Sequence, residues 1–392
     1  MQVAFKTYIT RFNWISFLSM IALIAIGAAV LASAGEARGG AFAGMWRTMV
    51  GTAAVGLVLY FVLAFTDYRS LLDWCAYPAY AGAICALVLV LAVGTLQFGG
   101  RRWLWFFQPS EISKLCLIAC FAQLFGPAGE RFRGQYGFRG FLLAGVLAAV
   151  PCALILLEPD LGTTLTLVPA IGVMMIAAGV WRKGIFCMLA VGIVAATAIL
   201  GAVYEAERPG ATPEQREQAL RYVPLHDHQV ERVKTFLFPE DDGLDSGYNL
   251  RQAKMTIGAG GLAGKGWRKG ESIRRQLLPP MGIMNDFIFC VWAEEMGYVK
   301  GSLVLLALFA ALCISTAWTA FVAGEGRGRL VALGMATLIF AHVYVNIGMS
   351  LGLVPITGLP LPFLSLGRTF LVTVMCGLGI VQSISIHREE TT

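Results

Sequence analysis

Long apolar stretches, each about as long as a bilayer-crossing helix, make up most of this sequence. A membrane-spanning helix needs ~20 consecutive, mainly apolar residues, and about ten segments meet or approach that length. They are 14–33, 48–66, 75–96, 111–126, 140–157, 163–180, 184–203, 303–323, 330–350 and 366–386. Only 14% of the residues are charged, whereas soluble domains have about 25%. We predict an all-α polytopic membrane protein with about ten transmembrane helices, forming a single domain over residues 1–392.

Basic residues in the short loops predict the orientation, because Lys and Arg favour cytoplasmic loops. A cytoplasmic N-terminus places most of them on one side: Lys6, Arg11, Arg69, Arg131, Arg133, Arg139, Arg182, Lys183, Arg327, Arg329 and Arg388. The opposite short loops hold Arg38, Arg47, Arg101 and Arg102. Both termini are therefore expected in the cytoplasm, with the first span as an uncleaved anchor. Residues 204–285 then form one large extracytoplasmic loop between spans 7 and 8, in a protein of the cytoplasmic (inner) membrane. The net charge of +6 reflects this topology, and no basic stripe indicates nucleic-acid binding.

Cysteine and histidine give no sign of a metal site. The nine cysteines lie in or beside apolar segments and form no C-x-x-C pair, so they are expected to be small buried apolar residues. His226 and His228 form an H-D-H sequence without a third ligand nearby. This favours a solvated loop over a zinc site.

The long loop is interpreted either as a functional amphipathic structure on the outer membrane surface or as a simple connector. Its later part mixes apolar, basic and glycine residues, which suits the first interpretation. The stretch GAGGLAGKG at 258–266 is not a phosphate-binding P-loop. Ala259 stands where the first glycine is needed, and Gly266 stands where Ser or Thr is needed. Its backbone N–H groups, with Lys265 as a point charge, could still bind an anion.

Polar residues gather at the predicted outer ends of several spans. Glu111 and Lys114 are three residues apart, so they share a helix face and can neutralise each other. Arg102 and Trp103 lie just before them, and Asp160 can cap the next outer helix. Residues 346–368 are too rich in proline and glycine for a plain helix, and irregular backbone at membrane depth must be buried by protein or face a wet cavity. We expect these polar residues to meet at one outer cavity.

The sequence NDFIFCVWAEEMG at 285–297 places a carboxylate at the same boundary. A continuous helix from Asp286 to Val322 would be about 55 Å long, whereas the hydrocarbon layer is ~30 Å thick. We therefore expect a bend at Gly297 and Gly301, with Asp286 near water. Asp286 is either a functional carboxylate or the N-cap of this helix. Glu294 and Glu295 are expected to form structural ion pairs or caps.

These stretches together resemble the SEDS family (shape, elongation, division and sporulation), and within it the RodA branch. The similar segments cover most of the chain in the order of the family. They are RW and QPSEISKL within 102–115, PDLGT at 159–163, FLFPEDDGLDSGYNLRQAKMTIGAGGLAGKGW at 236–267, DFIFCVWAEEMG at 286–297 and NIGMSLGLVPITGLPLPFLS at 346–365. One departure is SLGRT, with Leu366 and Arg368 where the family has Tyr and Gly.

The resemblance implies a peptidoglycan glycosyltransferase that polymerises lipid II at the outer face of the membrane, for cell elongation and rod shape. It further implies a complex with a class B penicillin-binding protein, a transpeptidase. Asp286 takes the position of the family's catalytic aspartate. The family's substrate-binding positions fall on Arg102, Trp103, Glu111 and Lys114.

We interpret Asp286 as the general base that takes a proton from the attacking sugar hydroxyl. Cationic groups must stabilise the departing polyprenyl pyrophosphate, and the candidates are Arg102, Arg232 and Lys265, with or without a divalent cation such as Mg²⁺ or Mn²⁺. The alternatives are a lipid II flippase or transporter, a septal FtsW-type polymerase, and a non-catalytic scaffold for a penicillin-binding protein.

Overall fold

The computed structural model describes residues 8–97, 100–105, 107–126, 137–208, 210–221, 223, 227–238, 246–275, 277 and 280–388. The long helices are α2 (Trp14–Arg38), α3 (Met45–Phe65), α4 (Tyr68–Val93), α5 (Pro109–Phe125), α7 (Gly137–Leu157), α8 (Leu161–Ala177), α9 (Arg182–Glu207), α16 (Leu303–Val322), α17 (Gly326–Leu351) and α18 (Arg368–Ile386). The shorter helical elements are η1 (Gly40–Phe42), α10 (Pro213–Leu220), α11 (Asp227–Leu237), α12 (Ser246–Gly260), α13 (Glu271–Arg274), α14 (Pro280–Asn285), α15 (Ile288–Gly297) and η2 (Tyr298–Ser302). A small antiparallel hairpin pairs β1 (Thr95–Gln97) with β2 (Gly100–Trp103).

The described residues contain eight helical segments long and apolar enough to cross a membrane, which confirms the polytopic helical fold. They are α2, α3, α4, α7, α9, α15 through α16, α17 and α18. The other two expected spans, 111–126 and 163–180, correspond to α5 and α8. Each of these helices has 17 residues, fewer than the ~20 of a full crossing. The hairpin at 95–103 was not expected from the sequence; it leads the chain from α4 towards α5.

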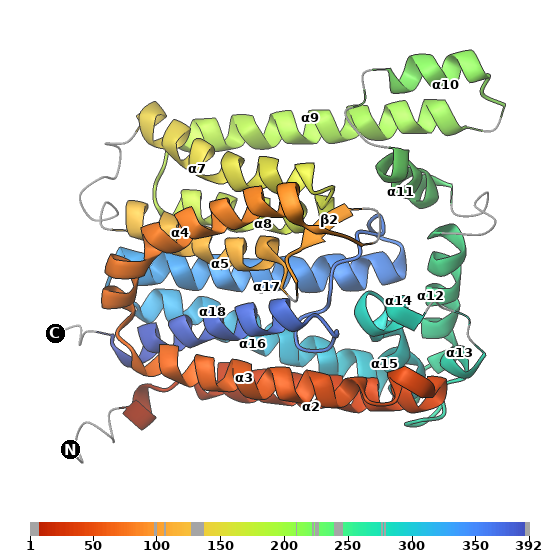
Figure 1. Cartoon of the computed structure of the whole chain (residues 1–392), viewed down its shortest axis with the longest axis horizontal. Helices are drawn as coiled ribbons and strands as arrows, with labels where there is room; N and C mark the ends of the chain where they lie inside the picture. Colours follow the sequence, from red (N-terminus) through yellow and green to blue (C-terminus); the bar gives the residue numbers. More distant parts are fainter. Residues whose placement is uncertain are drawn as a thin grey trace.

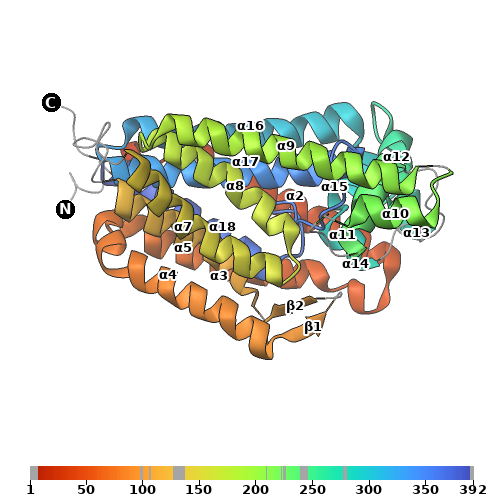
Figure 2. The same ribbon diagram turned by 90° about the horizontal axis from the view of Figure 1, so that it is seen from above.

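The long helices run side by side, and the two ends of the bundle differ (Figures 1 and 2). Helix α18 ends close to Arg11, just before α2, where the Ser385 hydroxyl donates to the Arg11 carbonyl at 2.7 Å. The short helices α10 to α14 gather at the opposite end. Because these helices belong to the predicted extracytoplasmic loop, that end is called the outer end below.

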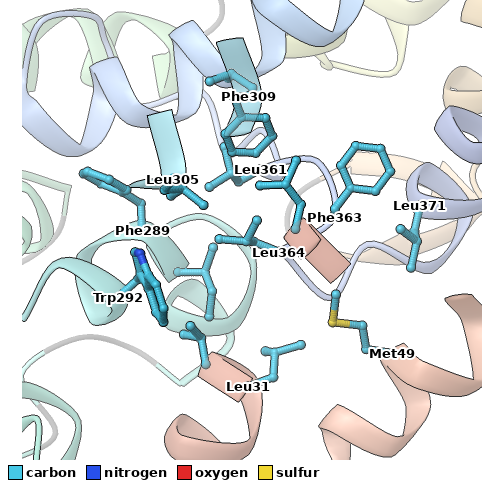
Figure 3. Close-up of a cluster of buried hydrophobic side chains, with 14 of the residues drawn as sticks. Leu31, Met49, Phe289, Trp292, Leu305, Phe309, Leu361, Phe363, Leu364 and Leu371 are labelled. Atoms are coloured by element: carbon cyan, nitrogen blue, oxygen red, sulfur yellow. The ribbon is translucent and has the colours of Figure 1, made fainter. Parts of the chain in front are cut away.

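Two clusters of buried apolar side chains hold the bundle together. One involves mainly α2, α3, α15, α16 and α18, and the other mainly α4, α5, α7, α8 and α17. Figure 3 shows part of the first cluster, in which Leu361, Phe363 and Leu364 lie among side chains of α2, α3, α15 and α16. These three residues belong to the irregular segment between α17 and α18. Of the two alternatives expected for this segment, burial by protein therefore holds for its later part, around residues 359–365, whereas residues 351–358 stay partly exposed.

The expected bend after Asp286 is also confirmed. The chain leaves α15 at Gly297, whose φ is +73°, and continues through η2 into α16. The glycine-rich stretch packs against this break. The N–H groups of Lys265 and Gly266 donate to the carbonyls of Glu294 and Glu295 at 3.0 and 2.8 Å. Both N–H groups are therefore already paired and cannot bind an anion as the stretch was expected to.

Replacing Gly264 with alanine is expected to destabilise this contact. Its φ is +80°, and an added Cβ would collide with the backbone of Glu295 to Gly297. Backbone strain of this kind costs roughly 1–3 kcal/mol. Gly258→Ala is the matched control, because nothing lies within 4 Å of its added Cβ and alanine gains about 0.5–1 kcal/mol over glycine inside a helix. Thermal unfolding in detergent measures the effect: the Tm of Gly264→Ala should be lower than that of wild type, and the Tm of Gly258→Ala should not. Equal Tm values for both variants would contradict the steric argument.

Candidate active site

Asp286 lies at the outer end of the bundle, between α14 and α15, and is half-buried. Its main chain is fixed from two sides. Its N–H donates to the Gly282 carbonyl at 2.8 Å, and its carbonyl accepts from the Asn346 side chain at 2.9 Å. The N-cap of α15 is Phe287, without a side-chain cap, so the N-cap interpretation of Asp286 is wrong. Its carboxylate forms no hydrogen bond or ion pair with any residue that the structure describes.

The polar environment of Asp286 comes from the irregular segment and from α11. The carboxylate oxygen Oδ2 lies beside Gly358, where an added Cβ would be 3.6 Å from it. Arg232 of α11 donates from Nη1 to the neighbouring Thr357 carbonyl at 3.2 Å. Burial raises the pKa of Asp286 to about 6, and the positive charge of Arg232 opposes that shift. This carboxyl can therefore both lose and regain a proton near neutral pH.

Arg102 and Asp160 are two further charged residues near Arg232. Burial lowers the pKa of Arg232, Arg102 lowers it further, and Asp286 and Asp160 act in the opposite direction. These four side chains therefore interact electrostatically although they come from β2, the turn before α8, α11 and the turn before α15. Three of the polar residues that were expected to meet, Arg102, Asp160 and Asp286, therefore lie near Arg232; the common outer cavity stays a prediction.

Arg102 is held by the turn between α7 and α8. Its guanidinium donates to the carbonyl of Glu158 at 3.0 Å and also to that of Pro159. Asp160 is the N-cap of α8, as expected, and accepts from the Thr163 N–H at 3.1 Å. Glu158 is fully buried, and neither of its carboxylate oxygens has a hydrogen-bond partner among the described residues. Burial, followed by the neighbouring Asp160, raises the pKa of Glu158 to about 8.

Glu111 and Lys114 form a separate, closed group inside the bundle. The Lys114 ammonium is 2.6 Å from the Glu111 carboxylate and 3.1 Å from Nε2 of His342. It also lies 4.9 Å from the centre of the Phe370 ring. Lys114 is 1% exposed and Glu111 is 4% exposed. In this conformation they bind each other and join α5 to α17 and α18, and a substrate would have to open this group to reach them.

Trp103 and Lys265 lie in different parts of the structure. Trp103 is half-buried on β2, immediately after Arg102. Lys265 forms an ion pair with Glu294, at 2.8 Å, near the end of α15 that is remote from Asp286. The predicted structural role of Glu294 is confirmed, because it also accepts from the N–H groups of Glu271 and Ser272 at the start of α13. The Lys265 ammonium is thus paired away from the other candidate cations.

Asn346 is a site residue that the sequence did not single out. It is fully buried, and its side-chain amide donates to the carbonyls of both Asp286 and Leu359. It thereby fixes the irregular segment against the turn that carries Asp286. The sequence did offer one indication, an amide side chain within the apolar segment 330–350. Burying a polar group inside a membrane segment costs free energy, so such a residue often has a functional or structural role.

The described residues contain no group of three or more His, Cys, Asp or Glu side chains that could hold a metal ion. Mg²⁺ often binds through one or two carboxylates together with substrate phosphates. The unpartnered carboxylate of Asp286 could supply one such ligand. The described residues therefore fit a cation held jointly with a phosphate-bearing substrate, and among them there is no site built from protein side chains alone.

Comparison with known proteins shows which family the chain belongs to. The sequence matches the FtsW/RodA/SpoVE family, described as cell cycle proteins, over residues 10–390. It is 35% identical over 377 residues to the peptidoglycan glycosyltransferase MrdB of Escherichia coli K12, covering 95% of this chain and 93% of MrdB. It is 26% identical over 435 residues to the peptidoglycan glycosyltransferase RodA of Treponema pallidum, covering 97% and 99% of the two chains.

Two solved structures have the same fold. The first belongs to a study of how a peptidoglycan synthase complex coordinates polymerization and crosslinking. It superposes with a TM-score of 0.75 at 28% identity, covering 97% of this chain and 99% of that one. The second is the rod shape determining protein RodA of Thermus thermophilus, with a TM-score of 0.67 at 25% identity and coverage of 97% and 98%. The chain belongs to the FtsW/RodA/SpoVE family of cell cycle proteins.

Proposed function

We infer that this protein is a peptidoglycan glycosyltransferase that polymerises lipid II into glycan strands for cell elongation and rod shape. The similarity to MrdB over nearly the whole chain supports the activity, and the likeness to a rod shape determining protein supports the role. The observation that carries the mechanism is the half-buried carboxylate of Asp286. It has no partner among the described residues, and its charge interacts with that of Arg232.

Asp286 acts as the general base. It accepts the proton of the sugar 4-hydroxyl of lipid II while that oxygen forms a bond to the anomeric carbon of the growing chain. The bond from the same carbon to the polyprenyl pyrophosphate breaks, and the pyrophosphate leaves with both electrons. Arg232 and Arg102, both held by backbone carbonyls, stabilise the negative charge of this leaving group. If a divalent cation takes part, Asp286 and the substrate phosphates would hold it, and it would supply further positive charge to stabilise the leaving group.

The site faces the outside of the cytoplasmic membrane in this proposal. The basic loop residues favour cytoplasmic termini, and α10 to α14 lie at the opposite end of the bundle (Figure 1). The partner is a class B penicillin-binding protein that cross-links the new strands. The likeness to a component of a complex coordinating polymerization and crosslinking supports this partner.

Polymerisation is expected to slow as the pH falls below about 6. The base must be ionised to accept a proton, and the pKa of Asp286 is raised to about 6. The value of kcat/KM should therefore be level above pH 7 and fall towards tenfold per pH unit well below 6. Initial rates of strand formation between pH 4.5 and 8 measure this profile. A flat profile across pH 6 would contradict the assignment of the base.

Glycan-strand formation from purified lipid II tests the proposed function directly. The protein is assayed with its class B partner, whose transpeptidase is blocked by a β-lactam, and the blocked partner alone is the control. Polymer is expected only when this protein is present. If the complete mixture makes no polymer, the polymerase proposal fails, and a flippase or a scaffold would have to account for the fold.

A further inference from the structure

A polar pocket lies at the outer end of α2, apart from Asp286. Its volume is about 410 Å³, and it is lined by Ser33, Glu36, Ala37, Arg268 and Arg274. The first three residues belong to the last turns of α2, and the two arginines lie between α12 and the end of α13. The Ser33 hydroxyl donates to Glu295, near the far end of α15 from Asp286. That helix has ten residues, so about 15 Å of helix separates the two sites.

The arginines of the pocket carry more charge than its carboxylate balances. Glu36 pairs with Arg268 at 2.8 Å. Arg274 donates from Nη2 to the Arg268 carbonyl at 2.8 Å and has no carboxylate within ion-pair distance among the described residues. Glu295 lies behind Ser33 and is not among the lining residues. An incoming anion would compete with Glu36 for Arg268 and would meet no competitor at Arg274.

Arg268 is held in a conformation that costs free energy. Its φ is +62°, which is unfavourable for a residue with a side chain and costs roughly 1–3 kcal/mol. The strained backbone allows the guanidinium to lie 4.3 Å from the centre of the Trp267 ring while it contacts Glu36. Strain of this kind persists only where the surrounding structure fixes the residue, and it is common at ligand-binding positions.

The position of the pocket along α2 suits contact with lipid headgroups. It lies where α2, a candidate membrane span, ends. The Trp267 indole donates to the Ala29 carbonyl of that helix at 3.4 Å, and its side chain is 46% exposed. Tryptophan is enriched at this membrane–water interface. Leu262, 70% exposed on the same loop, provides apolar surface for lipid chains.

We propose that this pocket binds a phosphate-bearing anion, of the kind found in the headgroup of an anionic phospholipid. Arg274 and Arg268 donate to the phosphate oxygens, since the guanidinium fork matches the geometry of phosphate. The volume is within the range of small-molecule sites, about 300–1,000 Å³. Bound lipid would hold α2 against α13 and the end of α15, and so stabilise the outer segment.

Lipid binding by the purified full-length protein in a neutral detergent tests the site. Native mass spectrometry and thermal unfolding are recorded with dioctanoyl phosphatidylglycerol, with dioctanoyl phosphatidylcholine, and with inorganic phosphate. Phosphatidylglycerol should bind and raise the Tm. Arg274→Gln should weaken this binding about tenfold, because charge-assisted hydrogen bonds are lost. Glu36→Gln should tighten binding, because the competing carboxylate is removed.

Arg275→Gln is the matched control, since Arg275 follows Arg274, pairs with Glu271 at 2.7 Å and does not line the pocket. It should bind like wild type. Stabilisation by the anionic lipid alone identifies a headgroup site, and stabilisation by inorganic phosphate as well identifies a general phosphate site. Unchanged binding by Arg274→Gln, or equal binding of both lipids to all variants, would overturn the proposal. None of these readouts depends on polymerase activity.

Discussion

Asp286→Asn is expected to lower the rate of glycan polymerisation by about 10²–10⁴-fold, the usual contribution of a general base. Asparagine keeps the shape of the side chain but cannot accept the proton of the attacking hydroxyl. Folding should be unaffected, because the wild-type carboxylate forms no hydrogen bond or ion pair with the described residues and its main-chain contacts to Gly282 and Asn346 remain. Initial rates at saturating lipid II, with Tm measured in parallel, separate the two effects.

Glu214→Gln serves as the control for this experiment. It makes the same carboxylate-to-amide change on an exposed residue of the outer helix α10, and it should polymerise lipid II like wild type. If Asp286→Asn also polymerises at the wild-type rate, Asp286 is not the base. The remaining candidate carboxylates near Arg102 would then be Glu158 and Asp160. A lowered rate with a lowered Tm would instead indicate misfolding.

The membrane fold was predictable because the bilayer imposes a length and a composition on each span. The gathering of Arg102 and Asp286 around Arg232 was predictable for a related reason. All three lie in segments placed at the outer boundary, where buried charges must face one another or water. The N-cap alternative for Asp286 could not be rejected from sequence, since a carboxylate before an apolar helix is equally typical of a cap.

Tertiary pairing of side chains was less predictable. The sequence around Lys265 shows no nearby acidic partner for its ammonium. In the structure its partner is Glu294, which lies 29 residues away in the sequence. A separation of that length does not predict a pair, so from the sequence alone Lys265 is a candidate for binding the pyrophosphate. The i,i+3 pairing of Glu111 with Lys114 was predicted and is confirmed. Their burial against His342 was not predicted, because it depends on how α17 packs on α5.

That burial makes Lys114→Met strongly destabilising. The substitution would leave the Glu111 carboxylate, whose side chain is 5% exposed, inside the protein without its cation. Breaking a buried ion pair on one side costs about 3–5 kcal/mol, whereas replacing both charges is often close to neutral. The double variant Glu111→Gln with Lys114→Met should therefore recover much of the lost stability. Thermal unfolding in detergent is the measurement, read as an operational Tm because membrane proteins of this size can unfold irreversibly.

Lys300→Met is the control, because Lys300 is exposed and has no ion-pair partner among the described residues; its Tm should stay at the wild-type value. A double variant no more stable than Lys114→Met alone would contradict the argument. It would show that the stability depends on the contacts of Lys114 with His342 and the Phe370 ring more than on an unpaired charge. In either case Lys114 joins α5, whose first turn follows the hairpin carrying Arg102, to α17, which carries Asn346, through its contact with His342. The buried lysine therefore fixes two helices that position residues of the active site.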